Sequence, residues 1–235
     1  LKRILPKPLL DAAEAIYERL AKLSRKPANV VRCKPIAGEP CMAVMCLQDA
    51  HFGKLCWKPE TGNNYDLAIA ERMYANAIVD LIDESKHRNI AKVVFLLGND
   101  LVHIDNANNT TFAGTPQDVE GRLSKIIETV EMAVINAVEQ AATIGPVSVQ
   151  LVPGNHDTTT SYHVARTIKA WFRNDKRVEV ECGPAPRKYV QWGTTLLGLA
   201  HGDGEKHESL PNIMATERPE MWAASTCREW LLGHM

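Results

Sequence analysis

Apolar and polar residues recur along this chain with two different periods, which predict its strands and helices. Short apolar runs typical of buried strands occur at residues 42–47, 92–97, 147–152, 196–200 and 230–232. Apolar residues at helical spacing occur at residues 9–24, 65–87, 118–142 and 161–174, and residues 211–228 fit short helices. Two further segments, residues 178–182 and 188–192, alternate with the two-residue period of a half-buried strand. A Gly193-Thr194 turn then predicts an antiparallel hairpin.

The order of these elements predicts the fold class. Strands and helices alternate in the first part of the chain, and a hairpin follows later. This order favours an α/β (α+β) fold, in which two stacked mixed β-sheets are flanked by helices. We expect residues 1–40 to form an N-terminal helix and a connector, and residues 41–235 to form one domain. A chain of 235 residues is long enough to bury one sizeable core.

Each apolar strand ends in Asp, Asn or His. The segments that follow the strands are Gln48-Asp49-Ala50-His51, Gly98-Asn99-Asp100, Gly154-Asn155-His156-Asp157, His201-Gly202-Asp203 and Gly233-His234. Ligands bind outside the carboxyl ends of the strands in an open α/β sheet, so we expect these side chains to converge. Carboxylates, imidazoles and an amide oxygen, without thiolate, suit Mn²⁺, Fe or Zn²⁺ and can accept Mg²⁺. The sequence therefore predicts a metal site, where a carboxylate such as Asp100 can bridge two ions.

The composition narrows the function classes. The formal net charge is -1 and the pI is about 6.8, so any nucleic-acid contact must come from a local patch. Six basic residues close together in sequence could form such a patch, although a solvated face is the simpler interpretation: Lys169, Arg173, Lys176, Arg177, Arg187 and Lys188. No apolar run is long enough to span a bilayer, and the first ten residues do not resemble a signal peptide. The six cysteines form no Cys-x-x-Cys pair, which favours reduced thiols and a cytoplasmic location.

In this order and with these gaps, the five polar segments resemble the motifs of the calcineurin-like metallophosphoesterases. The resemblance covers the chain from about Met42 to Met235. It implies a double β-sandwich flanked by helices and a pair of divalent metal ions, with Mn²⁺ favoured over Fe, Zn²⁺ and Mg²⁺. It also implies a water-activating, metal-dependent hydrolysis of phosphoric esters.

The resemblance assigns a role to each matching residue. Asp49 and His51 would bind the first metal, and Asp100 would bridge both. The second metal would be bound by Asn155, His201 and His234. His156 would act on the substrate, by stabilising the transition state or protonating the leaving oxygen, and Asp157 would orient the His156 ring.

Two positions depart from the family pattern. The family usually has Gly-Asp in the second motif, whereas Asn99 intervenes here. The last family motif is Gly-His-x-His, and this sequence stops at Met235, before the second His. We therefore expect the sequence to be part of a longer polypeptide, in which a further metal-ligating His follows Met235.

Within the family, the motifs favour a nuclease over a protein phosphatase. The Asp-Arg-Gly and Gly-Asn-His-Glu segments of the protein Ser/Thr phosphatases are absent. The segment Asp100-Leu101-Val102-His103 is instead similar to that of the SbcD-type DNA repair nucleases, and the chain also resembles metallophosphoesterases of phage-like genomes. This similarity would place His103 near the leaving group or the nucleotide, although an ordinary loop histidine is an equal alternative.

Three functions remain open on the sequence. The first is a dinuclear phosphodiesterase or nuclease acting on DNA or another nucleotide substrate. The second is a small-molecule phosphatase or cyclic-nucleotide phosphodiesterase, with a pocket closed by the long Asn99–Pro116 loop. The third is a non-catalytic binding module on the same fold. A homodimer or an ATPase partner is implied by the resemblance alone, and no membrane partner is expected.

Overall fold

The computed structural model describes residues 36–234, which all belong to one compact unit, Val31–Met235. The helix predicted at residues 9–24, and all of its connector before residue 36, lie outside the described residues. Met235 also lies outside them.

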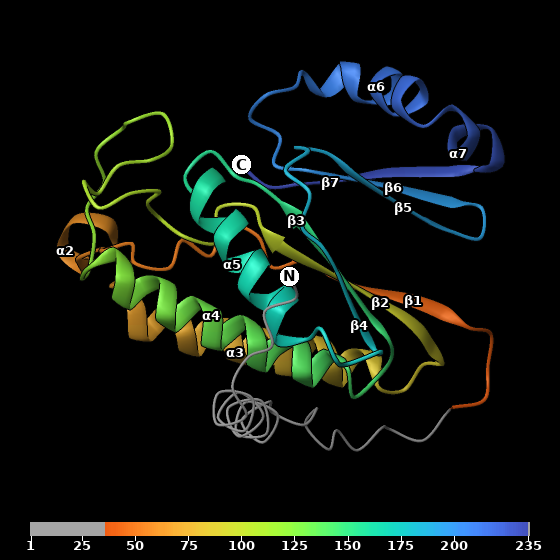
Figure 1. The fold of residues 1–235 in the computed structure, drawn as a ribbon, viewed down its shortest axis with the longest axis horizontal. Helices are drawn as coiled ribbons and strands as arrows, with labels where there is room; N and C mark the ends of the chain where they lie inside the picture. Colours follow the sequence, from red (N-terminus) through yellow and green to blue (C-terminus); the bar gives the residue numbers. More distant parts are fainter. Residues whose placement is uncertain (1–35, 235) are drawn as a thin grey trace, which may run out of the picture. The chain divides into compact units, whose positions relative to one another are not determined.

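The first sheet consists of four parallel strands in the order β1-β2-β3-β4. These strands are β1 (Cys41–Met45), β2 (Ile90–Gly98), β3 (Val147–Val152) and β4 (Val178–Glu181). The long helices that connect them are α3 (Leu67–Ser85), α4 (Leu123–Ala141) and α5 (Thr158–Trp171), and a short helix, α2 (Lys58–Thr61), precedes α3. Figure 1 shows α3, α4 and α5 together on one side of this sheet. Parallel strands need such crossover helices, so this half is an α/β unit.

The second sheet packs on the opposite face of the first. It has the order β5-β6-β7, with β5 (Lys188–Trp192) antiparallel and β7 (Cys227–Leu232) parallel to the central β6 (Thr195–Ala200). A 3₁₀ turn (His207–Ser209) and the helices α6 (Leu210–Glu217) and α7 (Pro219–Ala224) connect β6 to β7. Figure 1 shows α6 and α7 beyond this second sheet.

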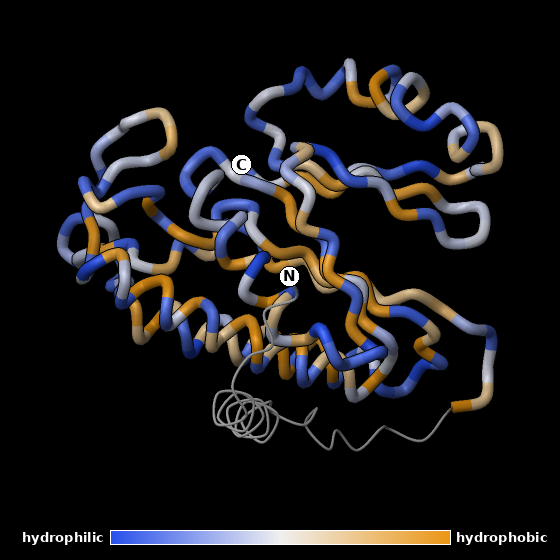
Figure 2. Tube along the Cα trace, in the orientation of Figure 1, coloured by the Kyte–Doolittle hydropathy of each residue, from blue (hydrophilic) through white to orange (hydrophobic). Residues whose placement is uncertain are grey.

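The alternation of side chains along β2 explains why the two sheets stack. Val93, Phe95 and Leu97 belong to the core beneath the three long helices. Val94 and Leu96 point the other way, into a second core shared with β5 and β6. Figure 2 shows β2 and β3 as hydrophobic segments in the interior, whereas α3 and α4 alternate between hydrophobic and hydrophilic residues. A strand buried on both faces needs a continuous apolar run, as this sequence has.

The predicted fold class is confirmed, and the mixed pairing is confined to the second sheet. The helix expected at residues 118–142 begins only at Leu123 because Val119 pairs with Lys54 and the Glu120 N–H donates to the Gly53 carbonyl. The helix expected at residues 161–174 begins earlier, at Thr158, and ends at Trp171. The predicted hairpin between residues 188 and 200 is present.

Three of the six basic residues are engaged within the protein, whereas Lys169, Arg173 and Lys176 are exposed. Arg177 pairs with Asp175, and Arg187 pairs with both Glu205 and Glu217. Lys188 is buried and donates to the Gly183 carbonyl. Arg177, Arg187 and Lys188 are therefore held by contacts within the protein. The five described cysteines are free thiols, and no helix within residues 36–234 is long and apolar enough to cross a membrane.

Candidate metal centre

All of the predicted site residues lie together at the carboxyl ends of five strands. The turn after β1 carries Asp49 and His51, the turn after β2 carries Asp100 and His103, and the turn after β3 carries Asn155, His156 and Asp157. The second sheet contributes His201 after β6 and His234 after β7. The carboxyl ends of strands from both sheets therefore meet at one place.

The backbone of these turns adopts a conformation that side chains usually avoid. Five non-glycine residues of the turns have φ values between 45° and 61°: Asp49, His51, Asn99, Asp100 and His234. Among the described non-glycine residues, Asn109 alone shares a positive φ with them. Left-handed backbone costs about 1–3 kcal/mol per residue, and such residues cluster at functional sites. Asn, Asp and His tolerate it best, which matches the residues found here.

Backbone hydrogen bonds join the three turns of the first sheet. The Asp49 N–H donates to the Asn99 carbonyl over 3.0 Å, and the His51 N–H donates to the Asp100 carbonyl over 2.9 Å. The Asn99 N–H donates in turn to the Val152 carbonyl at the end of β3. The His234 N–H reaches the Asp49 carboxylate over 3.3 Å, which connects the second sheet to the first motif. The site is therefore held by backbone contacts, and not only by its side chains.

Within the described part of the chain, three groups of donor atoms could hold a metal ion: two of them share Asp100, and the third joins His51, His103 and His156. The first group is Asp49, His51 and Asp100, and the second is Asp100, His201 and His234. Within each group, the ligand atoms lie within 4.8 Å of one another. The Asn155 amide oxygen adjoins the second group, 2.7 Å from His201 Nε2. The two groups that share Asp100 match the ligand sets implied by the family resemblance.

The Nε2 atom of His201 faces two oxygen atoms. Its Nδ1 contacts the Asn99 side-chain oxygen, which can only accept, so Nδ1 carries the hydrogen. In the neutral ring Nε2 is then an acceptor, yet it faces the Asn155 oxygen at 2.7 Å and an Asp100 oxygen at 3.2 Å. With the Asn99 oxygen facing Nδ1, three acceptors meet around one point and need a proton or a metal ion between them, and the Asn99 amide nitrogen is buried without a partner among the described residues. Burial alone would lower the pKa of His201, but the Asp100 carboxylate outweighs it and raises this pKa, so a proton takes this place when no ion is bound. The donor set therefore fits a bound cation.

The ionisation states of the other donors also fit a metal. Burial lowers the pKa of His51 to about 4, so its ring is neutral and can ligate. Burial alone would raise the pKa of the Asp100 carboxyl. The His201 ring, which donates from Nε2 when it is protonated, and the His156 N–H outweigh that effect and keep this pKa below its ordinary value. The bridging candidate is thus a carboxylate.

The His156 ring is oriented by His103, and not by Asp157 as predicted. His156 Nδ1 lies 2.9 Å from the His103 carbonyl, so Nδ1 carries the hydrogen and Nε2 is left for another partner. The two rings also stack with centroids 5.1 Å apart. The fully buried Asp157 carboxylate instead accepts the backbone N–H groups of Val102 and Gly154, and burial raises its pKa to about 7. Asp157 therefore holds the turns together, and its predicted contact with the His156 ring is wrong.

His103 lies inside the cluster. Its ring is 5% exposed, and its Nδ1 is 3.2 Å from His51 Nδ1. Burial is the main cause that lowers its pKa, to about 3, so the ring is neutral. Its direct contact with a substrate stays a prediction.

Two residues with structural roles in the site were not identified from the sequence. Asn99, treated as a departure from the motif, is fully buried and sets the tautomer of His201. Asp105 accepts the N–H groups of Thr159 and Thr160 in the first turn of α5, which fixes the loop after β2 against that helix. A lone Asp in a polar loop carries no sequence signal for such a long-range cap.

Replacing Asn99 with alanine is expected to lower Mn²⁺ affinity by about 10–100-fold, because a partner that orients a ligating His is lost. The measurement is titration with Mn²⁺ followed by calorimetry. Asn109→Ala is the matched control, since Asn109 has a φ of 58° against 59° for Asn99 but is not among the site residues. Equal affinity of the Asn99→Ala and Asn109→Ala variants would contradict the role assigned to Asn99.

Gly154 leaves room for the Asp100 carboxylate. A Cβ at this position would lie well within 3.0 Å of both the Asp100 carboxylate and the Asp100 backbone nitrogen. Gly154→Ala is therefore expected to destabilise the protein by about 1–3 kcal/mol, through local overpacking, and to weaken metal binding. Denaturant unfolding and Mn²⁺ titration would measure the two effects. Gly204→Ala is the control because its Cβ would meet open space, and similar losses in both variants would refute this explanation.

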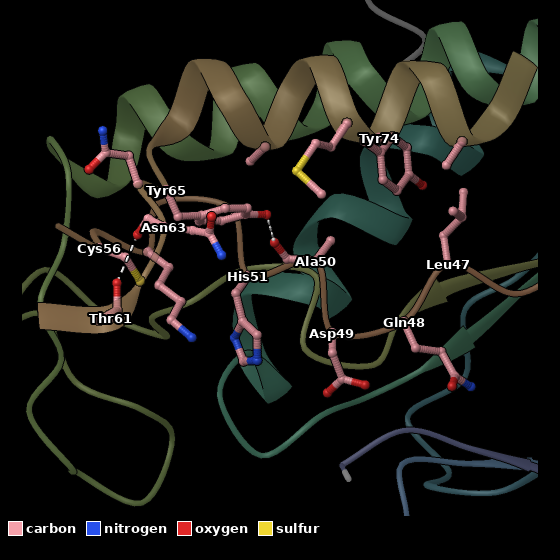
Figure 3. Close-up of a pocket in the computed structure, with 15 residues that line it drawn as sticks. Leu47, Gln48, Asp49, Ala50, His51, Cys56, Thr61, Asn63, Tyr65 and Tyr74 are labelled. Carbon is pink, nitrogen blue, oxygen red and sulfur yellow. Dashed lines mark hydrogen bonds between the residues drawn. The ribbon is translucent and has the colours of Figure 1, made fainter. Parts of the chain in front are cut away.

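A cavity of about 550 Å³ adjoins the first metal group. Asp49 and His51 form part of its wall, together with residues of the following loop and of α3 (Figure 3). Its lining residues lie between Leu47 and Ala77, so the Asn99–Pro116 loop does not close it. This cavity therefore lacks the closure by the Asn99–Pro116 loop that the small-molecule phosphatase alternative predicts.

Comparison of the chain with protein-family models, with curated proteins and with solved structures found no match. The resemblance to calcineurin-like metallophosphoesterases therefore rests on the sequence motifs and stays a prediction.

Proposed function

We propose that this protein is a dinuclear metal-dependent phosphoesterase, which hydrolyses phosphodiesters of DNA or of nucleotides. The observation that carries the proposal is the pair of ligand groups, Asp49-His51-Asp100 and Asp100-His201-His234, with one shared carboxylate. Sites with two divalent ions that share a carboxylate are suited to phosphoryl chemistry. The mixed oxygen and nitrogen donors favour Mn²⁺, with Fe, Zn²⁺ and Mg²⁺ as alternatives.

The contacts of the side chains support a role for each of them. Asp49 and His51 would hold one ion, Asn155, His201 and His234 the other, and Asp100 both. Ions bound there would lower the pKa of a water and neutralise charge on the phosphate oxygens. Asn99 keeps His201 in the tautomer that presents Nε2, and Gly154 allows Asp100 to approach its backbone neighbours.

His156 is the candidate for direct action on the substrate. The His103 carbonyl fixes the hydrogen on His156 Nδ1, so Nε2 is available to the substrate. The His156 ring is close to the first ligand group, with its centroid 4.7 Å from that of His51. A protonated Nε2 can donate to the leaving oxygen as that oxygen gains charge, and afterwards the neutral ring can be reprotonated from solvent.

The first test is the hydrolysis of bis-p-nitrophenyl phosphate and of p-nitrophenyl phosphate with added Mn²⁺ and after its removal with EDTA. We expect Mn²⁺-dependent cleavage with a preference for the diester. A preference for the monoester would favour the phosphatase alternative. Absence of turnover, together with absence of bound metal, would contradict the proposal and favour the non-catalytic module.

A further inference from the structure

The cavity next to Asp49 and His51 has two chemically different ends. Figure 3 shows Thr61, Asn63 and Tyr65 at one end and Leu47 and Tyr74 at the other, with His51 and Asp49 between them along one wall. Ala70, Met73 and Ala77 of α3 complete the apolar part of the lining. A volume of about 550 Å³ falls in the range of about 300–1,000 Å³ that is typical of sites for small organic ligands.

The polar end is built by an ordered loop. Cys56 and Tyr65 exchange two backbone hydrogen bonds, of 2.9 and 3.0 Å, which close the segment that carries Asn63 and Asn64. Asn64 Oδ1 accepts the Lys58 N–H, and the Tyr65 hydroxyl donates to the Ala50 carbonyl beside the first motif. Asn63 is exposed, and within residues 36–234 its side-chain amide has no hydrogen-bond partner in the protein. A side-chain amide carries both donors and an acceptor, as the polar edge of a nucleobase does.

Lys54 adds a positive charge at the boundary between the cavity and the metal centre. It lines the cavity, is half-buried, and its backbone N–H donates to the His51 carbonyl. Its charge acts on both His51 and His103. Among the described residues, no acceptor or carboxylate pairs with its ammonium group. A half-buried, unpaired ammonium beside a metal centre suits a phosphate oxygen.

We propose that this cavity binds the nucleoside of a nucleotide ester, whose phosphate lies at the Asp49-His51 edge beside Lys54. The base would lie against the apolar surface of α3 and direct its polar edge to Asn63. This inference rests on the proposed function and specifies its substrate. The nucleoside could belong to a free nucleotide or to the end of a nucleic-acid strand, since both present the same chemistry to the cavity.

The first experiment compares two esters with the same leaving group, thymidine 5′-(p-nitrophenyl phosphate) and methyl p-nitrophenyl phosphate, using the full chain with Mn²⁺. We expect kcat/KM to be at least about tenfold higher for the thymidine ester, because the cavity contributes binding only to that ester. Ala77→Phe places a ring in the apolar part of the cavity, where the base would lie, and should reduce this preference to about one. Ala68→Phe is the matched control, because Ala68 is exposed on the same helix and does not line the cavity, and it should retain the preference.

Direct binding separates failure of this inference from failure of the proposed function. Calorimetry with thymidine and adenosine 5′-monophosphates should show binding that Ala77→Phe weakens at least about tenfold and Ala68→Phe does not. Lys54→Gln, a milder change, should weaken binding of the monophosphate but not of the free nucleoside. Binding of this kind without hydrolysis would keep the cavity assignment while the enzyme proposal falls. Competition by a monophosphate or by a short single-stranded oligonucleotide distinguishes the two sources of the nucleoside.

Three results would overturn the assignment. The first is hydrolysis of both esters with no preference in the unmodified protein. The second is an equal effect of Ala77→Phe on both esters, because the cavity would then hold the nitrophenyl group that they share. The third is absence of binding of both monophosphates.

Discussion

Replacing Asp100 with asparagine is expected to remove bound Mn²⁺ from both ligand groups and to lower diester hydrolysis by about 10²–10³-fold. Asp100 is the member common to the two groups, and it is ionised because the His201 ring and the His156 N–H outweigh its burial. Asparagine has nearly the same size as aspartate, so the packing of this side chain against Gly154 stays the same. The loss can therefore be assigned to the charge.

Metal content after dialysis and kcat/KM for bis-p-nitrophenyl phosphate would measure the effect. Asp80→Asn is the matched control, since Asp80 is exposed on α3 and is not among the site residues. Circular dichroism would show whether the Asp100→Asn variant folds. A folded variant that keeps two equivalents of metal would contradict the bridging role and, with it, the dinuclear arrangement.

The sequence predicts the first sheet well because burial on both faces leaves a strong pattern. Residues 93–97 are an unbroken apolar run, and the structure buries all of them, with alternate side chains in two different cores. The hairpin of the second sheet also has a local signal, a Gly-Thr turn between alternating segments. Helix starts are less predictable, because the first turn of α5 is capped by Asp105, which is far away in sequence.

The position of the site was predictable, but its internal contacts were not. Asp, Asn and His at the strand ends must converge once the strands are parallel, and this fixes the location without any side-chain detail. Which atom holds the His156 ring depends on how the turn after β2 folds back. That turn presents the His103 carbonyl to the ring. Every residue has a backbone carbonyl, so the sequence carries no signal for this contact. The same holds for Asn99, whose role follows from its left-handed backbone and its contact with His201.

Replacing His156 with alanine is expected to lower hydrolysis by about 10²–10⁴-fold while leaving the bound metal unchanged. His156 lies outside the two ligand groups that share Asp100. Among the described residues, its only possible metal group, with His51 and His103, has no carboxylate, and its Nδ1 is already engaged by the His103 carbonyl. The variant therefore loses a group that acts on the substrate and keeps the proposed ligands. Asp100→Asn is expected to lose its bound metal, whereas His156→Ala is expected to keep it. The two variants together therefore separate metal binding from proton transfer. His163→Ala, an exposed histidine on α5, is the control.

The size of the loss should depend on the leaving group if His156 donates a proton. Nitrophenolate is a weak base and leaves without much help, whereas the alkoxide of a dinucleotide is a strong base and needs protonation. We therefore expect His156→Ala to slow the dinucleotide more than bis-p-nitrophenyl phosphate, when kcat/KM is compared for the two substrates. Equal losses would mean that His156 stabilises charge on the phosphate without donating a proton to the leaving oxygen. No loss with either substrate, in a variant that retains its metal, would remove His156 from the mechanism.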